Sequence, residues 1–261
     1  DYGLSYLINN SDPKDLSFNI KDFSSGFLTW LLLASIVLVD PSYHQRIYSV
    51  DNPKTAKKGM IWAVVLWSIF DFFTLSTALF GKAILNNPSP NLLYPELGAF
   101  ILPDYLEPLF FLGIFATIMS TTDSFLFISA LGLSNDILLK NKINFGLSNE
   151  KLARWSILLI SILSLIIAVF YANKTALSLF LDFTPVICSA LVIPTIFSWS
   201  KRFKLSGNLV FIQMLLSAFF CIITQLFPFK IGGILIPSIW IGMLISMITQ
   251  LVFIILYKVK K

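Results

Sequence analysis

Seven stretches of this chain are each long and apolar enough to cross a lipid bilayer, and this feature limits the fold more than any other. A helix needs about 20 predominantly apolar residues to span the hydrocarbon layer. Because backbone groups inside lipid must be hydrogen-bonded within the segment, such stretches fold as helices. The sequence therefore predicts an all-α integral membrane protein with about seven transmembrane helices, over residues 24–49, 59–85, 107–139, 152–171, 175–199, 208–227 and 234–257.

The composition and the placement of charge agree with a membrane protein. Charged residues make up 13% of the 261 positions, whereas a soluble domain carries about a quarter. The net charge of +5 does not indicate nucleic-acid binding, because 14 of the 19 Lys and Arg residues lie after the first, third, fifth and seventh predicted spans. By the positive-inside rule these loops and the C-terminus are cytoplasmic. We expect the protein in a bacterial-type inner membrane or a plasma membrane.

The third predicted span carries an unusual group of polar side chains. Thr117, Ser120, Thr121 and Ser124 are spaced i, i+3, i+4 and i+7, so they share one helix face, and Asp123 borders that face. Such a face is costly in hydrocarbon unless it meets protein, water or an ion. Hydroxyl, carbonyl and carboxylate oxygens suit a small hard cation, and the acidic ligands are too few for Ca²⁺. Alternatively, the hydroxyls bond to their own helix or hold neighbouring helices together.

Two other acidic residues fall inside predicted spans. Pro41 disfavours the helical conformation at Asp40, so the first span should break or kink there. Broken membrane helices expose backbone groups that transporters use for ions and polar substrates, although a plain kink near the interface remains an alternative. Asp71 lies in the middle of the second span and is interpreted as a protonated structural acid, a proton site or a partner for a group missing from this chain. Within the proline-rich loop 86–108, a short lid helix is predicted around residues 92–101.

No catalytic arrangement is visible in the sequence. His44 is the single histidine, and no nucleophile elbow, metalloprotease helix or phosphate-binding loop occurs. Asp123 alone is a poor base for Ser120 or Ser124. We therefore expect a protein that is not an enzyme.

Two motifs resemble the sodium:solute symporter family, which includes sodium/glucose, sodium/proline and sodium/pantothenate transporters. One is DPSYHQR at 40–46 followed by PKTAKKG at 53–59, which resembles the end of the family's broken sixth core helix and the loop after it. The other is GIFATIMSTTDS at 113–124, with Asn135, Asp136 and Ile137 downstream, which resembles its eighth core helix.

The resemblance implies a leucine-transporter-type bundle of two inverted five-helix repeats. This chain would hold the second repeat at 24–199, preceded by an external loop at 1–23 and followed by two additional helices at 200–261. The chain starts at Asp1 in a polar loop, so we expect it to be the C-terminal portion of a longer protein, with the missing N-terminal half as its partner.

The resemblance also implies a site and a function. The main sodium site would take the Thr117 carbonyl and the hydroxyls of Ser120 and Thr121, and a second would use Asp123 and Ser124. Asp40 is a candidate solute contact. The expected function is sodium-coupled symport of a small organic solute by alternating access, and the alternative is a transporter-like module that senses solute. The identity of the solute, the number of sodium ions and any proton coupling stay open.

Overall fold

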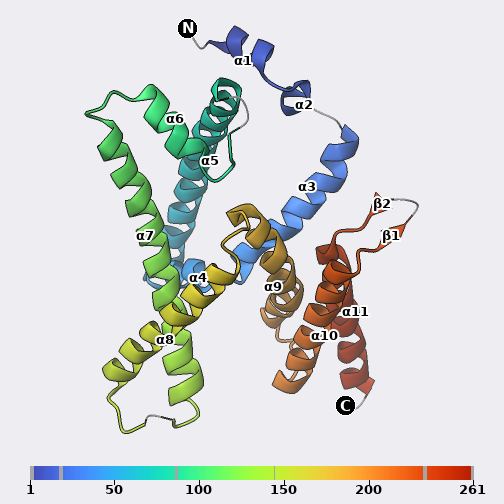
Figure 1. Ribbon diagram of the computed structural model, residues 1–261. Helices are drawn as coiled ribbons and strands as arrows, with labels where there is room; N and C mark the ends of the chain where they lie inside the picture. The colour runs from blue at the N-terminus through green and yellow to red at the C-terminus, as the bar shows by residue number, and fades with distance from the viewer. Residues whose placement is uncertain (1–2, 18–19, 86–87, 144, 232–233, 260–261) are drawn as a thin grey trace. The chain divides into compact units, whose positions relative to one another are not determined.

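The computed structural model describes residues 3–17, 20–85, 88–143, 145–231 and 234–259, and nearly all of their regular structure is helical (Figure 1). Within these ranges six helices are long and apolar enough to cross a membrane, or seven if one bent pair is a single span. The prediction of an all-α integral membrane protein is confirmed. The helices are α1 (Leu4–Asn10), α2 (Pro13–Leu16), α3 (Ile20–Ala34), the 3₁₀ turn η1 (Ser35–Leu38), α4 (Pro41–Tyr48), α5 (Pro53–Ile84), α6 (Leu93–Ile101), α7 (Glu107–Leu131), the π-helical η2 (Gly132–Leu139), α8 (Asn149–Phe170), α9 (Ala176–Ser198), α10 (Gly207–Leu226) and α11 (Ser238–Val259).

Every predicted span is helical, although the first is broken into α3, η1 and α4. The start of α5 differs from the prediction. The helix begins at Pro53 instead of residue 59. Asn52 stands at the N-cap, and its side chain accepts a hydrogen bond of 2.8 Å from the backbone N–H of Lys54. Proline is favoured at the first helical position because that position needs no N–H. The polar residues that suggested a loop are therefore the first turns of the helix.

The last span also starts later than predicted, at Ser238 instead of residue 234. Two short antiparallel strands, β1 (Lys230–Ile231) and β2 (Ile234–Leu235), occupy the segment before it. Pro237 comes directly before the helix, and a proline disfavours helical conformation in the residue that precedes it. The apolar run alone gives no signal for this hairpin.

The chain divides into two compact units. The first unit comprises 1–17 and 45–175, and its main helices are α5 to α8. The predicted short helix in the loop after α5 is confirmed as α6. It lies close to α5, because a Cβ on Gly81 would stand 3.1 Å from side-chain carbons of both Leu93 and Leu97. Tyr94 fixes the same contact by donating a hydrogen bond of 2.7 Å to the Thr74 carbonyl.

The second unit comprises 18–44 and 176–261, and α9, α10 and α11 lie side by side in it (Figure 1). Its apolar core gathers side chains from α3, α9 and α11. The three long helices approach most closely at Gly242, where an added Cβ would stand 2.6 Å from the Cβ of Ser189 and 2.9 Å from that of Cys221. Small residues at helix contacts are how membrane helices pack closely. The domain boundaries expected from the sequence, at residues 23 and 199, stay a prediction.

Candidate sodium site

The polar face of α7 is regular helix and lies open within its unit. Thr117, Ser120, Thr121, Asp123 and Ser124 are all exposed, and all are within the α-helix. At 3.6 residues per turn the four hydroxyl-bearing residues occupy one side, and Asp123 projects about 60° further round than Ser120. The structure therefore brings together the five α7 residues that the sequence had singled out on one half of the helix surface.

Two oxygens on this face are close enough to share one cation. The Thr121 Oγ1 donates a hydrogen bond of 3.0 Å to the carbonyl of Thr117, so these two oxygens are neighbours. Oxygens around a hard cation such as Ca²⁺ lie at roughly 2.3–2.6 Å from it, which places adjacent ligands about 3.3–3.7 Å apart. A small opening of this contact would admit an ion between them. The third expected ligand, the Ser120 hydroxyl, has no hydrogen-bond partner among the residues that the structure describes.

A second pair of oxygens lies one turn along the helix. Ser124 Oγ donates a hydrogen bond of 2.9 Å to the carbonyl of Ser120. Asp123, beside it, makes no ion pair or hydrogen bond within the described part of the chain. An unpaired carboxylate on a membrane-spanning helix is costly, and the binding of a cation by Asp123 stays a prediction.

The hydroxyls of α7 that donate hydrogen bonds to carbonyls of their own helix can still bind a cation through their oxygen atoms. Thr117 Oγ1 donates to the Gly113 carbonyl at 2.9 Å, and Thr122 Oγ1 donates to the Ile118 carbonyl at 2.8 Å. Each bond uses the hydroxyl proton, whereas the oxygen has two lone pairs that can still accept. Thr122 points away from the polar face, about 100° round the helix from Thr121. It therefore serves as an internal control for the behaviour of a threonine that lies outside the site.

The predicted break at Asp40 and Pro41 is present. The segments Gly26–Leu38 and Pro41–Tyr48 are bent by 49° at this point. The half-buried Asp40 accepts a hydrogen bond of 2.8 Å from the backbone N–H of Ser42, so its carboxylate satisfies an amide at the start of α4. His44 Nε2 lies 2.8 Å from the Leu38 carbonyl, across the break. The structure thus gives Asp40 a capping role, and its contact with a solute stays a prediction.

Asp71 is another acidic residue inside a membrane-spanning helix. Asp71 is exposed on α5, and the structure gives it no hydrogen bond or ion pair within the described ranges. In those same ranges there is no group of three or more His, Cys, Asp and Glu side chains that could hold a metal ion. The oxygens of α7 are therefore the donor set on which a cation site can be argued.

A buried polar cluster in the second unit was missed at the level of sequence. Gln213 of α10 is fully buried, and its Nε2 donates a hydrogen bond of 2.9 Å to the carbonyl of Ser246 in α11. Ser217 and Gln250 are buried one turn away on the same two helices. The spacing of four residues in each pair was the available signal, since it places both polar groups on one face. Interhelical hydrogen bonds of this kind stabilise membrane bundles.

Comparisons with known proteins agree with the helices and motifs described above. The model of the sodium:solute symporter family matches residues 8–213. Searches of curated proteins and of solved structures each returned no match. The family match covers most of the chain, including the helix break at Pro41 and the whole of α7. The chain therefore belongs to the sodium:solute symporter family.

Proposed function

We propose that this protein takes up a small organic solute together with sodium, and that the ion binds the Thr117 carbonyl and the hydroxyls of Ser120 and Thr121. The observation that supports this most directly is that the Ser120 hydroxyl, which has no hydrogen-bond partner among the described residues, shares one exposed helix face with Thr117 and Thr121. Membership of a sodium-coupled transporter family supports the choice of ion. These ligand oxygens are uncharged, which suits a monovalent cation better than a divalent one.

One helix supplies too few oxygen ligands to complete a sodium site, and this couples ion binding to the movement of α7. Three oxygens from α7 are fewer than the about six that a hard cation takes, so the remainder must come from another segment, the solute or water. A bound ion then holds α7 against that segment, and loss of the ion lets the two part. Alternating access is the transport cycle in which this contact forms on one side of the membrane and opens on the other.

The other residues predicted from the sequence take secondary roles in this proposal. Asp123 and Ser124 would hold a second sodium ion one turn further along α7. The helix break at Asp40 would present backbone groups and its carboxylate to the solute. The positive-inside rule supports a cytoplasmic C-terminus, so in this proposal the third span runs from the outside inward and the ion leaves towards the cell interior.

The test compares variants that lose a hydroxyl from the polar face of α7 with a variant that loses one from the other side of the helix. Full-length protein is reconstituted into vesicles, and solute uptake is measured across a range of sodium concentrations for Ser120→Ala, Thr121→Ala and Thr122→Ala. Removal of one hydroxyl oxygen that binds the ion costs about 1.5–3 kcal/mol of binding free energy. The half-saturating sodium concentration should therefore rise by about 10- to 150-fold in Ser120→Ala and Thr121→Ala. Thr122→Ala removes the same group from the other side of the helix and should behave as wild type. Unchanged sodium dependence in Ser120→Ala and Thr121→Ala would refute the assignment.

A further inference from the structure

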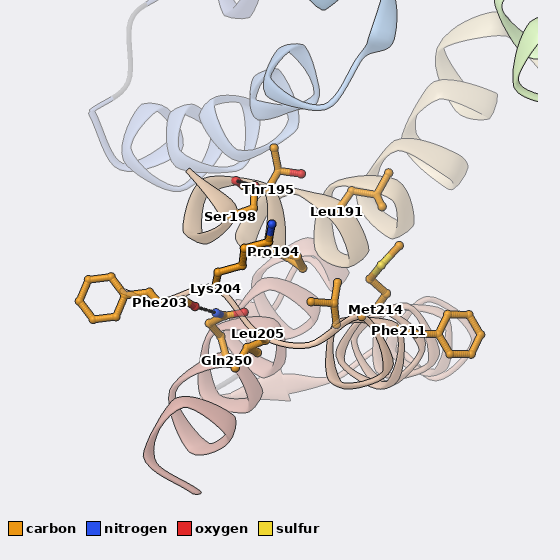
Figure 2. A pocket seen from close by; sticks show the side chains of 12 residues that line it. Leu191, Pro194, Thr195, Ser198, Phe203, Lys204, Leu205, Phe211, Met214 and Gln250 are labelled. Carbon is orange, nitrogen blue, oxygen red and sulfur yellow. Dashed lines mark hydrogen bonds between the residues drawn. The ribbon is translucent and has the colours of Figure 1, made fainter. Parts of the chain in front are cut away.

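A cavity of about 500 Å³ in the second unit takes no part in the proposed transport cycle (Figure 2). It is lined by the last turns of α9, the following loop and the first turns of α10, with Gln250 of α11 at one side. Its volume falls within the range of ordinary ligand pockets, about 300–1,000 Å³. All of these elements belong to one compact unit, so the cavity is defined by packing inside that unit.

One end of the cavity attracts negative charge. Lys204 lines it, and the loop 199–206 also carries Lys201 and Arg202 without any acidic residue. Gly207, the first residue of α10, stands in the wall. Ser206 occupies the N-cap position, yet its side chain makes no capping hydrogen bond to the first turn. The amides of that turn and the Lys204 ammonium together suit a phosphate group.

Gln250, at one side of the cavity, has a buried amide oxygen without a hydrogen-bond donor among the described residues. Its side chain is 2% exposed, and its Nε2 donates a hydrogen bond of 3.2 Å to the Phe203 carbonyl. Figure 2 shows the amide nitrogen turned towards Phe203 and the amide oxygen on the opposite side. That oxygen is buried and has no partner among the described residues. A buried carbonyl normally has a donor, and an occupant of the cavity that carries a hydroxyl as well as a negative charge would supply one.

The other end of the cavity is apolar and continues to the outer surface of α10. Leu191 and Met214 line this end, and Phe211 beside them is 60% exposed (Figure 2). Trp199, directly after α9, is 63% exposed, as expected for an aromatic residue at the membrane–water interface. A basic pocket that opens to lipid at this depth fits an amphipathic ligand.

We propose that this cavity binds an anionic phospholipid with hydroxyl groups on its headgroup, of which phosphatidylglycerol is the example. The phosphate lies at Lys204 and the first amides of α10, and a headgroup hydroxyl donates to Gln250 Oε1. The start of an acyl chain lies along Leu191 and Met214. Since the basic loop is on the predicted cytoplasmic side, the lipid comes from that leaflet.

Native mass spectrometry of the delipidated full-length protein in detergent tests the charge contact. Phosphatidylglycerol, phosphatidylcholine and inorganic phosphate are titrated separately, and the first should bind most tightly. Lys204→Gln should weaken phosphatidylglycerol binding by about tenfold, because it removes a charge-assisted contact. Lys201→Gln removes the same charge from the same loop without touching the cavity and should leave binding within about twofold. Equal weakening by both variants, or no preference over phosphatidylcholine, would overturn the proposal.

A second comparison tests the hydroxyl contact with Gln250. Phosphatidylmethanol carries the same charge as phosphatidylglycerol but lacks headgroup hydroxyls, so the wild type should bind it several-fold more weakly. Gln250→Met should abolish this difference, and the wild-type comparison stands alone if that variant does not fold. Equal binding of the two lipids by the wild type would refute the role of Gln250. Displacement of the lipid by inorganic phosphate at a similar concentration would refute the lipid as occupant.

Discussion

The close approach of α11 to its neighbours predicts that Gly242→Ala destabilises the second unit. The new Cβ would stand 2.6 Å from the Cβ of Ser189 and 2.9 Å from the Cβ of Cys221, and it would also meet the Ser189 hydroxyl. Carbon atoms pack best at about 3.5–4.0 Å, so each contact is too short by about 1 Å. Neither Cβ can rotate away, because its position is fixed by the backbone. The helices must therefore separate to admit the methyl group.

Two opposing effects determine how far Gly242→Ala lowers the free energy of unfolding. Overpacking a well-packed contact costs about 1–3 kcal/mol, while replacing a helical glycine by alanine stabilises by about 0.5–1 kcal/mol. The net destabilisation is then roughly 0–2.5 kcal/mol, or a fall in Tm of up to about 10 °C for a chain of this size. Gly59→Ala is the matched control, because Gly59 lies inside α5 and a Cβ there would meet nothing within 4 Å.

Thermal unfolding of the purified protein in detergent, followed by loss of the monodisperse peak on size-exclusion chromatography, measures both variants. Gly59→Ala should unfold at or above the wild-type temperature, and Gly242→Ala below it. Adding Ser189→Gly to Gly242→Ala removes the nearest obstructing atoms and should restore part of the loss. If Gly242→Ala is as stable as Gly59→Ala, the three helices do not meet at this residue and the packing argument fails.

Two further predictions concern the first unit. Asp123→Asn should lower the Hill coefficient of sodium-dependent uptake towards about one, since it removes the charge expected to hold a second ion; an unchanged Hill coefficient would contradict that role. Tyr94→Phe should speed hydrogen exchange of the α6 amides, because it leaves the Thr74 carbonyl without its 2.7 Å partner. Burial raises the pKa of Tyr94 above its usual 10.0, so the neutral phenol is favoured in the folded state, and the wild-type contact should weaken only as the pH rises through that raised value. Wild-type α6 amides that exchange as fast as those of Tyr94→Phe at neutral pH would contradict this.

Local sequence signals predicted the features that local chemistry determines. The bend at Pro41 was predictable because proline removes a donor and restricts the residue before it. The shared face of Thr117, Ser120, Thr121 and Ser124 needed only the helical period, and α7 is helical throughout that stretch. The seven spans followed from length and hydropathy, with errors confined to their ends.

Features that depend on contacts between distant segments were not predictable in the same way. Nothing in the sequence around Gln213 and Gln250 says which helix their side chains meet, because polar residues in a membrane helix can face protein, water or a ligand. The role of Asp40 as a cap at the helix break became visible only with the 2.8 Å hydrogen bond to Ser42. The cavity beside Lys204 likewise requires α9, α10 and α11 to be placed together.

Polar side chains at the contact of α10 and α11 in the second unit are buried, whereas those on the polar face of α7 in the first unit are exposed. In the second unit Gln213 is buried and bonded to Ser246, so its amide nitrogen holds α10 against α11. In the first unit the hydroxyls of α7 and the carboxylate of Asp123 are exposed, and the carboxylate has no partner in the described part of the chain. A polar group that faces hydrocarbon without a partner is costly, whereas one that binds an ion only during part of a cycle must be left accessible. The buried pairs of α10 and α11 therefore fit a permanent contact, while the binding of an ion at the exposed face of α7 stays a prediction.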